Sequence, residues 1–116
     1  LIALAARAMR QILVDSARAR LSAKRGGGVA AVELDAEALA TPALAEELVA
    51  LDRALERLAA QDERLARLVE WRYFGGMTDG ELARAFERDE RTIRRDWEKA
   101  RAFLLRELGG PVPGLA

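Results

Sequence analysis

The sequence predicts an all-α protein in which one N-terminal helix and a linker precede a compact four-helix domain. The 116 residues are rich in alanine, leucine, arginine and glutamate, a composition that favours helix. Apolar residues recur at helical spacing in several segments, and no segment has a strong strand pattern. Capping residues and glycines separate these segments. We expect a helix over 1–25, a flexible acidic linker over 26–43, the helical domain over 44–108 and a tail over 109–116.

The first two expected helices are defined by their apolar positions. The segment 1–25 has one broad apolar face and is followed by three glycines, which end a helix. The segment 44–60 has five leucines at alternating spacings of four and three, the pattern of an amphipathic helix. The expected apolar residues are Leu4, Met9, Ile12, Leu13 and Ala17 in the first helix, and Leu44, Leu48, Leu51, Leu55 and Leu58 in the second.

Caps mark the next two helices. Asp62 is suited to cap a third helix, which the pair Gly75-Gly76 ends. Thr78 and Glu81 have the spacing of a capping box, so they predict the start of a short helix that ends near Phe86. The inward residues of these two helices are expected to be Leu65, Leu68, Val69 and Tyr73, followed by Leu82, Ala83 and Phe86.

Residues 78–98 have the pattern of a helix-turn-helix. The short capped helix is followed by a tight turn at Glu87-Arg88 and by a longer helix, 90–108, which Asp89 caps. The small side chain of Ala83 allows the two helices to approach closely. The longer helix is expected to bury Ile93, Trp97, Ala100, Leu104 and Leu108.

The opposite face of this longer helix is predicted to be exposed and rich in arginine. Its residues lie at i, i+3, i+4 and i+7, namely Arg91, Arg94, Arg95 and Glu98. Arginine can donate two hydrogen bonds to guanine or bind phosphate. Glu90 and Thr92 lie in the first turn, where recognition helices usually meet base edges, and Glu90 can accept from cytosine N4. The pattern therefore predicts DNA binding by this face.

Composition excludes most enzymatic chemistry. The chain has no cysteine and no histidine, so it lacks a thiol nucleophile, a disulfide framework and the usual general base near neutral pH. Acidic pairs such as Asp62-Glu63 are better explained as helix caps than as catalytic or metal-binding groups. No apolar run approaches the roughly 20 residues that span a bilayer. We expect no enzymatic activity, no catalytic residue, no cofactor, no metal and no membrane partner.

The formal net charge is zero, but positive and negative residues are concentrated in different segments of the chain. Residues 1–28 have a net charge of +5, residues 29–70 of −6 and residues 71–116 of +1. Such asymmetry indicates different partners for different segments. The acidic linker is also suited to shield the basic face of the free protein.

Two parts of the chain resemble a known protein family. Residues 69–78 (VEWRYFGGMT), 81–83 (ELA) and 91–97 (RTIRRDW) resemble region 4 of sigma-70-family RNA polymerase factors, and in particular the extracytoplasmic-function (ECF) group. Residues 5–15 (AARAMRQILVD) and 23–28 (AKRGGG) resemble the end of region 2 in one ECF-like subgroup. The resemblance covers about 1–28 and 44–108. It implies that 1–25 is the last helix of region 2 and 44–108 is region 4, a helix-turn-helix domain of the winged-helix-like class.

The resemblance implies a promoter-recognition subunit of bacterial RNA polymerase that acts in the cytoplasm, at the nucleoid. In the family, region 4 contacts the −35 element through its second helix and docks on the flap of the polymerase β subunit. By position, Glu90, Arg91, Arg94 and Arg95 would face the −35 major groove, with Glu98 on the same stripe. Thr92 and the N-termini of the two helices, the first of which begins at Thr78, would hold phosphates.

The last helix of region 2 supplies a second set of expected contacts. Arg10, Arg18 and Arg20 would touch the −10 element or its backbone. The family binds the β′ coiled coil through the earlier part of region 2, which has no match here. We therefore expect the chain to be part of a longer factor. The N-terminal helix is expected to pack onto region 4 or to pair with a second copy, and an anti-sigma factor is a further candidate partner.

The sequence departs from the family at the turn of the helix-turn-helix. Family members often have Gly and then Val where this chain has Glu87 and Arg88. Glu87 must therefore adopt whatever backbone conformation the turn needs, and Arg88 replaces an apolar side chain.

Two alternatives remain open from the residues alone. The first is a DNA-binding domain of another transcription regulator. The second is a helical protein-interaction domain without DNA contact. Solvent exposure of Arg91, Arg94 and Arg95 favours DNA binding, whereas pairing with Glu87, Glu90 and Glu98 favours the interaction domain.

Overall fold

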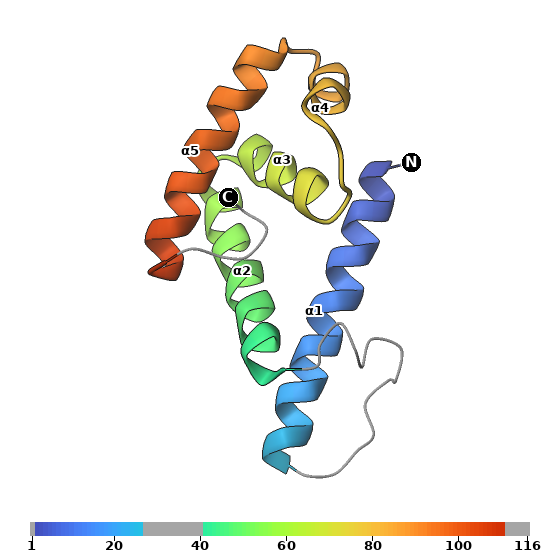
Figure 1. Cartoon of the computed structure of the whole chain (residues 1–116), viewed down its shortest axis with the longest axis vertical. Coiled ribbons are helices and arrows are strands. Elements are labelled where there is room, and N and C mark those ends of the chain that lie inside the picture. The colour runs from blue at the N-terminus through green and yellow to red at the C-terminus, as the bar shows by residue number, and fades with distance from the viewer. Residues whose placement is uncertain (1, 27–40, 111–116) are drawn as a thin grey trace.

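The computed structural model describes residues 2–26 and 41–110 of the chain, and these form five α-helices with no strand among them (Figure 1). The all-α prediction is therefore confirmed. The helices are α1 (Ile2–Gly26), α2 (Pro42–Gln61), α3 (Glu63–Tyr73), α4 (Asp79–Phe86) and α5 (Glu90–Leu108). Most of the predicted linker, residues 27–40, and most of the predicted tail, residues 111–116, lie outside the described residues. None of the described helices is both long and apolar enough to cross a membrane.

Local caps determine where α2 and α3 begin. The Thr41 side chain accepts a hydrogen bond from the Leu44 amide at 3.1 Å, and Pro42 occupies the first turn. The helix consequently begins at Pro42, two residues before the predicted start, because the fixed φ of proline suits the first helical position. Asp62 ends α2 through its amide, which donates to the Leu58 carbonyl at 2.7 Å. Its side chain then accepts from the Leu65 amide at 3.2 Å, so the predicted cap of α3 is confirmed.

The main core lies where α2, α3, α4 and α5 meet. Its fully buried side chains come from all four helices and are Leu51, Leu55, Leu68, Val69, Leu82, Ile93 and Leu104. Each of these positions belongs to an apolar face that the sequence predicts. Trp71 of α3 stacks on Phe86 of α4 with ring centroids 4.7 Å apart, which adds an aromatic contact at the edge of the core.

The predicted apolar face of α1 is wrong. Leu4 is 73% exposed, and Met9 and Ile12 are also exposed. The side of α1 that packs against α2 instead buries Ala6, Val14 and Ala17, which are smaller residues. Only Ala17 of the predicted face is buried, and Leu13 is half-buried. The reason is tertiary. The facing surface of α2 and α3 carries the carboxylates of Asp52 and Glu70, and both bind Arg10, which lies on the same side of α1 as Ala6 and Val14.

The helices are arranged so that one end of the molecule is free. In Figure 1, α1 runs beside α2 and its N-terminus lies near the end of α3. The helix α4 and the first half of α5 form the end of the molecule that lies beyond the N-terminus of α1. The helix-turn-helix is therefore presented at one end of an elongated molecule whose longest dimension is 49 Å.

Candidate nucleic-acid interface

The first helix of the helix-turn-helix begins with the predicted capping box. The Thr78 hydroxyl accepts a hydrogen bond from the Glu81 amide at 3.1 Å, and the Glu81 carboxylate accepts from the Thr78 amide at 2.8 Å. These reciprocal bonds satisfy two amides at the start of α4 that have no partner inside the helix. Thr78 itself is exposed, so the start of this helix lies at the surface.

The turn between α4 and α5 depends on Glu87. Its backbone has φ 56° and ψ 48°, the left-handed conformation that glycine adopts most easily. The chain then closes with the Arg88 amide, which donates to the Ala83 carbonyl at 2.9 Å. Glu87 thus accepts the conformation that the turn requires, as its departure from the family pattern predicts.

Asp89 begins the second helix of the motif. Its carboxylate accepts a hydrogen bond from the Thr92 amide at 2.8 Å. This bond and a second one from the Thr92 side chain lower the pKa of Asp89, and the positive charges of Arg91 and Arg95 act in the same direction. The cap therefore stays ionised and the first turn of α5 is held in place.

The arginine-rich face of α5 lies at the surface. Ile93, Trp97 and Ala100 turn one side of the helix into the core. The residues on the other side are exposed, namely Glu90, Arg91, Arg94, Arg95 and Glu98, while Thr92 is partly buried. The structure brings these predicted site residues together on one exposed face.

The arginines of this face are largely without carboxylate partners. Arg94 lies 3.8 Å from Glu90, and both side chains are more than half exposed, a type of pair that contributes little. Neither Arg91 nor Arg95 lies within ion-pair distance of a carboxylate in the described part of the chain. Both guanidinium groups can therefore approach a polyanion without first breaking an ion pair.

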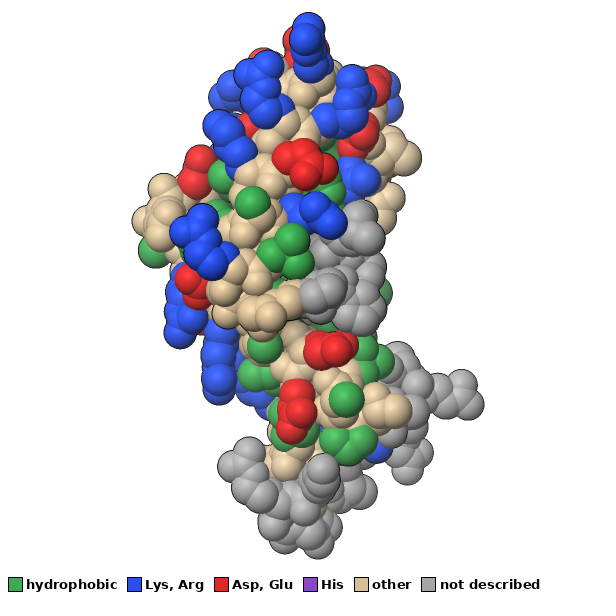
Figure 2. Space-filling model, turned by 60° about the vertical axis from the view of Figure 1, so that its left-hand side comes forward, with side chains coloured by type: hydrophobic (Ala, Val, Ile, Leu, Met, Phe, Trp, Pro, Cys, Tyr) green, Lys and Arg blue, Asp and Glu red, His purple; other side chains and the backbone are tan. Residues whose placement is uncertain are grey.

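Further basic side chains extend this face over α4 and the turn. Figure 2 shows Lys and Arg side chains gathered at the end of the molecule that α4 and the first half of α5 form. The exposed basic residues between 84 and 99 are Arg84, Arg88, Arg91, Arg94, Arg95 and Lys99. The exposed acidic ones are Glu87, Asp89, Glu90 and Glu98, so the surface has a modest positive surplus.

A comparison with protein families agrees with this geometry. The family model described as ECF sigma factor matches residues 1–110, nearly the whole chain. The chain belongs to this family. No curated protein and no solved structure matches it. ECF sigma factors are sigma-70-family, DNA-binding, non-enzymatic proteins of transcription initiation, and they associate with RNA polymerase and promoter DNA.

Arg72 of this ECF sigma factor connects three helices around the exposed face. It extends from the last turn of α3 and forms an ion pair with Asp79 in the first turn of α4. Its guanidinium carbon also lies 4.6 Å from the centre of the Trp97 ring in α5, a cation–π contact. Arg72 thereby helps set the angle between the two helices of the motif.

A second ion pair fixes the rotation of α5 in the sigma factor. Asp96 is buried and pairs with Arg64 of α3, and this hydrogen bond raises the pKa of Arg64. Neither role, that of Arg72 or that of Asp96, was predicted from the sequence. The position of Asp96 carried a signal, because it lies next to Trp97 on the buried side of an amphipathic helix. A carboxylate in such a position needs a buried partner.

The arginines expected to contact −10 DNA lie elsewhere in the sigma factor. Arg10 has only 15% of its side chain exposed and donates hydrogen bonds to Asp52 and Glu70. Arg18 binds Asp52 and lies near Asp15, while Arg20 is partly buried and has a partner of its own. These three residues are not part of the α5 surface, and their contact with DNA stays a prediction.

Among the described residues, no group of three or more acidic side chains is arranged to hold a metal ion.

Proposed function

We propose that α2 to α5 form region 4 of the sigma factor, that α1 is the last helix of region 2, and that α5 contacts the −35 element. The observation that carries this proposal is the exposed face of α5. Its arginines are held on a helix whose other side is anchored in the core, at the free end of a helix-turn-helix. In this motif the second helix enters the major groove with its N-terminal residues toward base edges.

Each residue of the face has a role that follows from its place on α5. Arg91, Arg94 and Arg95 are suited to donate paired hydrogen bonds to guanine O6 and N7 or to bind phosphate. Glu90 is suited to accept from cytosine N4, and Glu98 extends the same stripe. Thr92 and the N-termini of α4 and α5 would hold backbone phosphates, since the amides there carry partial positive charge.

The exposure of these arginines also bears on the alternative of a protein-interaction domain without DNA contact. A protein-interaction domain without DNA contact was expected to pair them with Glu87, Glu90 and Glu98. Only Arg94 approaches one of these acids, at a distance that leaves its guanidinium accessible. This arrangement favours DNA contact.

Affinity for promoter DNA would come mainly from assembly with the polymerase. The basic surplus of the α4–α5 surface is small, so the free chain is expected to bind duplex DNA weakly and with a strong salt dependence. We propose that the same domain docks on the flap of the β subunit, which would hold α5 against the −35 element.

The test uses core RNA polymerase retained on the immobilised chain, with a free β-flap fragment as competitor. The retained complex then selects duplexes from a pool of random sequence. Arg94→Ala or Arg95→Ala is expected to weaken binding of the selected duplex by about 1–3 kcal/mol, because each change removes a paired contact to a base.

Arg67→Ala is the matched control. Arg67 is an arginine of similar exposure on α3, and its ion-pair partner among the described residues is Glu63. The proposed function is contradicted if the Arg94 and Arg95 variants select duplexes as the unsubstituted chain does. It is also contradicted if the flap fragment does not reduce the amount of polymerase retained.

A further inference from the structure

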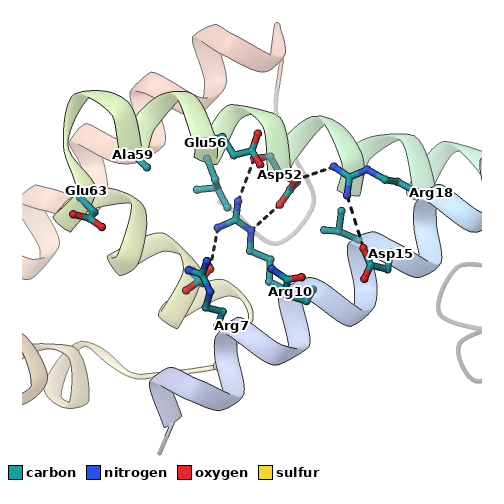
Figure 3. A pocket seen from close by; sticks show the side chains of 12 residues that line it. Arg7, Arg10, Asp15, Arg18, Asp52, Glu56, Ala59 and Glu63 are labelled. Carbon is teal, nitrogen blue, oxygen red and sulfur yellow. Dashed lines mark hydrogen bonds and ion pairs between the residues drawn. The ribbon is translucent and has the colours of Figure 1, made fainter.

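Three carboxylates are buried among the described residues, and one of them lies on α5. Two of the three, Asp52 and Glu70, bind Arg10 of α1, and Figure 3 shows this arginine directed toward Asp52. The third carboxylate, Asp96, is 3% exposed and lies directly beside Trp97 on the inner side of α5. Its partner is therefore in a position to act on the helix that carries the exposed arginines.

Asp96 and Trp97 are both held by arginines of α3. Arg64, in the first turn of α3, forms an ion pair with Asp96. Arg72, in the last turn, lies with its guanidinium carbon 4.6 Å from the centre of the Trp97 ring and pairs with Asp79 of α4. The two arginines are separated by about 12 Å along the axis of α3, at about 1.5 Å per residue. We call these contacts of Arg64 and Arg72 the α3 clamp.

The α3 clamp opposes rotation of α5 about its own axis. Adjacent residues of a helix point about 100° apart, so Asp96 and Trp97 meet α3 at two different angles. Rotation in either direction would stretch at least one of the two contacts. The apolar side chains of α5, such as Ile93 and Leu104, do not restrict rotation in the same way, because apolar burial is non-directional. A charge-assisted hydrogen bond requires a fixed distance and angle.

The rotation of α5 determines where its exposed arginines point. Arg91 and Arg95 lie about 100–160° around the helix axis from Asp96 and Trp97, on the side away from α3. A rotation of about 30° would move a group about 6 Å from the axis by about 3 Å, which is the length of a hydrogen bond. Paired hydrogen bonds to one base cannot form across such a displacement. A small rotation would therefore change which bases this face can contact.

We propose that Arg64 and Arg72 are positioning residues, which set the rotation of α5 and thereby decide which bases its exposed face contacts. The part of this proposal that concerns bases rests on the proposed function, whereas the effect on rotation does not depend on it. Both guanidinium groups act through the side chains that they hold on α4 and α5, so neither is expected to touch a base.

The first test measures the rotation of α5 in the free chain. The chain has no cysteine, so Ala50→Cys in α2 and Ala102→Cys in α5 introduce its only two thiols, and both positions are exposed. Spin labels at these sites are measured by pulsed electron resonance in an excess of unlabelled chain, so that only distances within one molecule are seen. The chain with an intact clamp is expected to give a single narrow distance.

The informative variant is Arg64→Gln with Asp96→Asn. It removes both charges of the pair at once, so no buried charge is left without a partner and the fold should be retained. The matched control is Arg57→Gln with Glu107→Gln, which removes another ion pair to α5, in which Arg57 is exposed. Both double variants leave the net charge unchanged, so a difference between them is not a general effect of charge.

We expect the informative variant to broaden the label distance and to shift its mean, and the control to keep the narrow distance. Arg64→Lys retains a positive charge opposite Asp96 and should also keep the distance narrow. A distance that stays narrow and unshifted when both charges of the pair are removed overturns the proposal.

A second variant tests the other half of the clamp and guards against loss of the fold in the first. Arg72→Gln with Asp79→Asn changes two side chains that are only partly buried, so the fold should again be retained. This variant is also expected to shift the label distance. The same distance as in the unsubstituted clamp would rule out the role of Arg72.

The second test asks whether the clamp decides base preference. Complexes of core RNA polymerase with each variant select duplexes from a pool of random sequence. The clamp variants are expected to lose about tenfold in discrimination at the base pairs that the unsubstituted chain prefers. The slope of log K against log salt should not change, because neither arginine is expected to bind phosphate.

Two results of this selection contradict the proposal. If the clamp variants select the same sequence with the same discrimination, the clamp does not decide base choice. If the salt slope of the Arg72 variant falls by about 0.9, Arg72 itself binds a phosphate and is not a positioning residue.

Arg94→Ala separates this proposal from the proposed function. It changes the exposed face and not the clamp, so it should weaken duplex selection and leave the label distance unchanged. If the complex with the unsubstituted chain selects no duplex at all, the proposed function fails, while the label distances still decide whether the clamp sets the rotation of α5.

Discussion

Glu87 carries the most unusual backbone conformation of a single residue in this sigma factor. Among the described residues it is the non-glycine residue with a positive φ, whereas Gly76 and Gly109 take the other left-handed positions. An L-residue in this conformation is strained by about 1–2 kcal/mol because Cβ approaches the following carbonyl. The strain is located between the two helices that present the arginine-rich face.

Glu87→Gly is therefore expected to stabilise the domain. The gain should be about 0.5–1 kcal/mol, since relief of strain exceeds the extra chain entropy that glycine brings to the unfolded state. Urea unfolding followed by tryptophan fluorescence measures the change. The control is Ala85→Gly on the same helix, where ordinary helical geometry predicts a loss of about 1 kcal/mol. A Glu87→Gly variant that loses stability contradicts the account of the turn.

The helix α5 owes its starting point to one carboxylate. Asp89 accepts from the Thr92 amide, and this bond lowers the pKa of Asp89 below its usual value. A carboxyl with a lower pKa in the folded state stabilises the fold at any pH above its unfolded pKa. That contribution disappears as the pH falls through the folded pKa.

Asp89→Ala should consequently lower the free energy of unfolding at neutral pH, and the difference from the unsubstituted chain should vanish in strong acid. Urea unfolding at a series of pH values measures this difference. Asp89→Asn is the control, because asparagine also caps helices but does not titrate in this range. A penalty for Asp89→Ala that is the same at acidic and neutral pH would exclude the capping carboxylate as its cause.

At the scale of the whole molecule, Gly75 determines how closely α1 approaches the domain. A Cβ at this position would lie 2.6 Å from the Trp71 carbonyl oxygen and 3.0 Å from the Ala6 Cβ. Neither neighbour is a flexible side-chain end, so the backbone of α3 or α1 would have to move. The glycine pair after α3 thus ends a helix and also makes room for α1.

Gly75→Ala is expected to destabilise the chain by about 1–3 kcal/mol, the usual cost of overpacking. The urea midpoint reports this loss. Gly110→Ala is the matched control, because a Cβ there has no neighbour within 4 Å and its backbone needs no positive φ. Equal midpoints for the two variants would show that α1 does not pack against Gly75.

The sequence by itself was sufficient to predict the helices, their caps and the exposed face of α5. Thr78, Asp62 and Asp89 cap the helices they were predicted to cap, and the arginine stripe is exposed opposite Ile93 and Trp97. These features depend on residues three or four apart in the chain, so helical geometry alone relates them. The family resemblance added the assignment of regions 2 and 4, which stays a prediction, and the match over residues 1–110 confirms the family.

Only the tertiary structure decided which side of α1 packs inward and which arginines are occupied. Arg10 meets Asp52 and Glu70 across 42 and 60 residues of sequence, and Asp96 meets Arg64 across 32. No periodicity within one helix encodes such pairs. Their formation depends on where α1, α2 and α3 lie in space. The need of a buried carboxylate on one helix for a charged partner can decide which face of another helix packs inward, even against the apolar pattern of that helix.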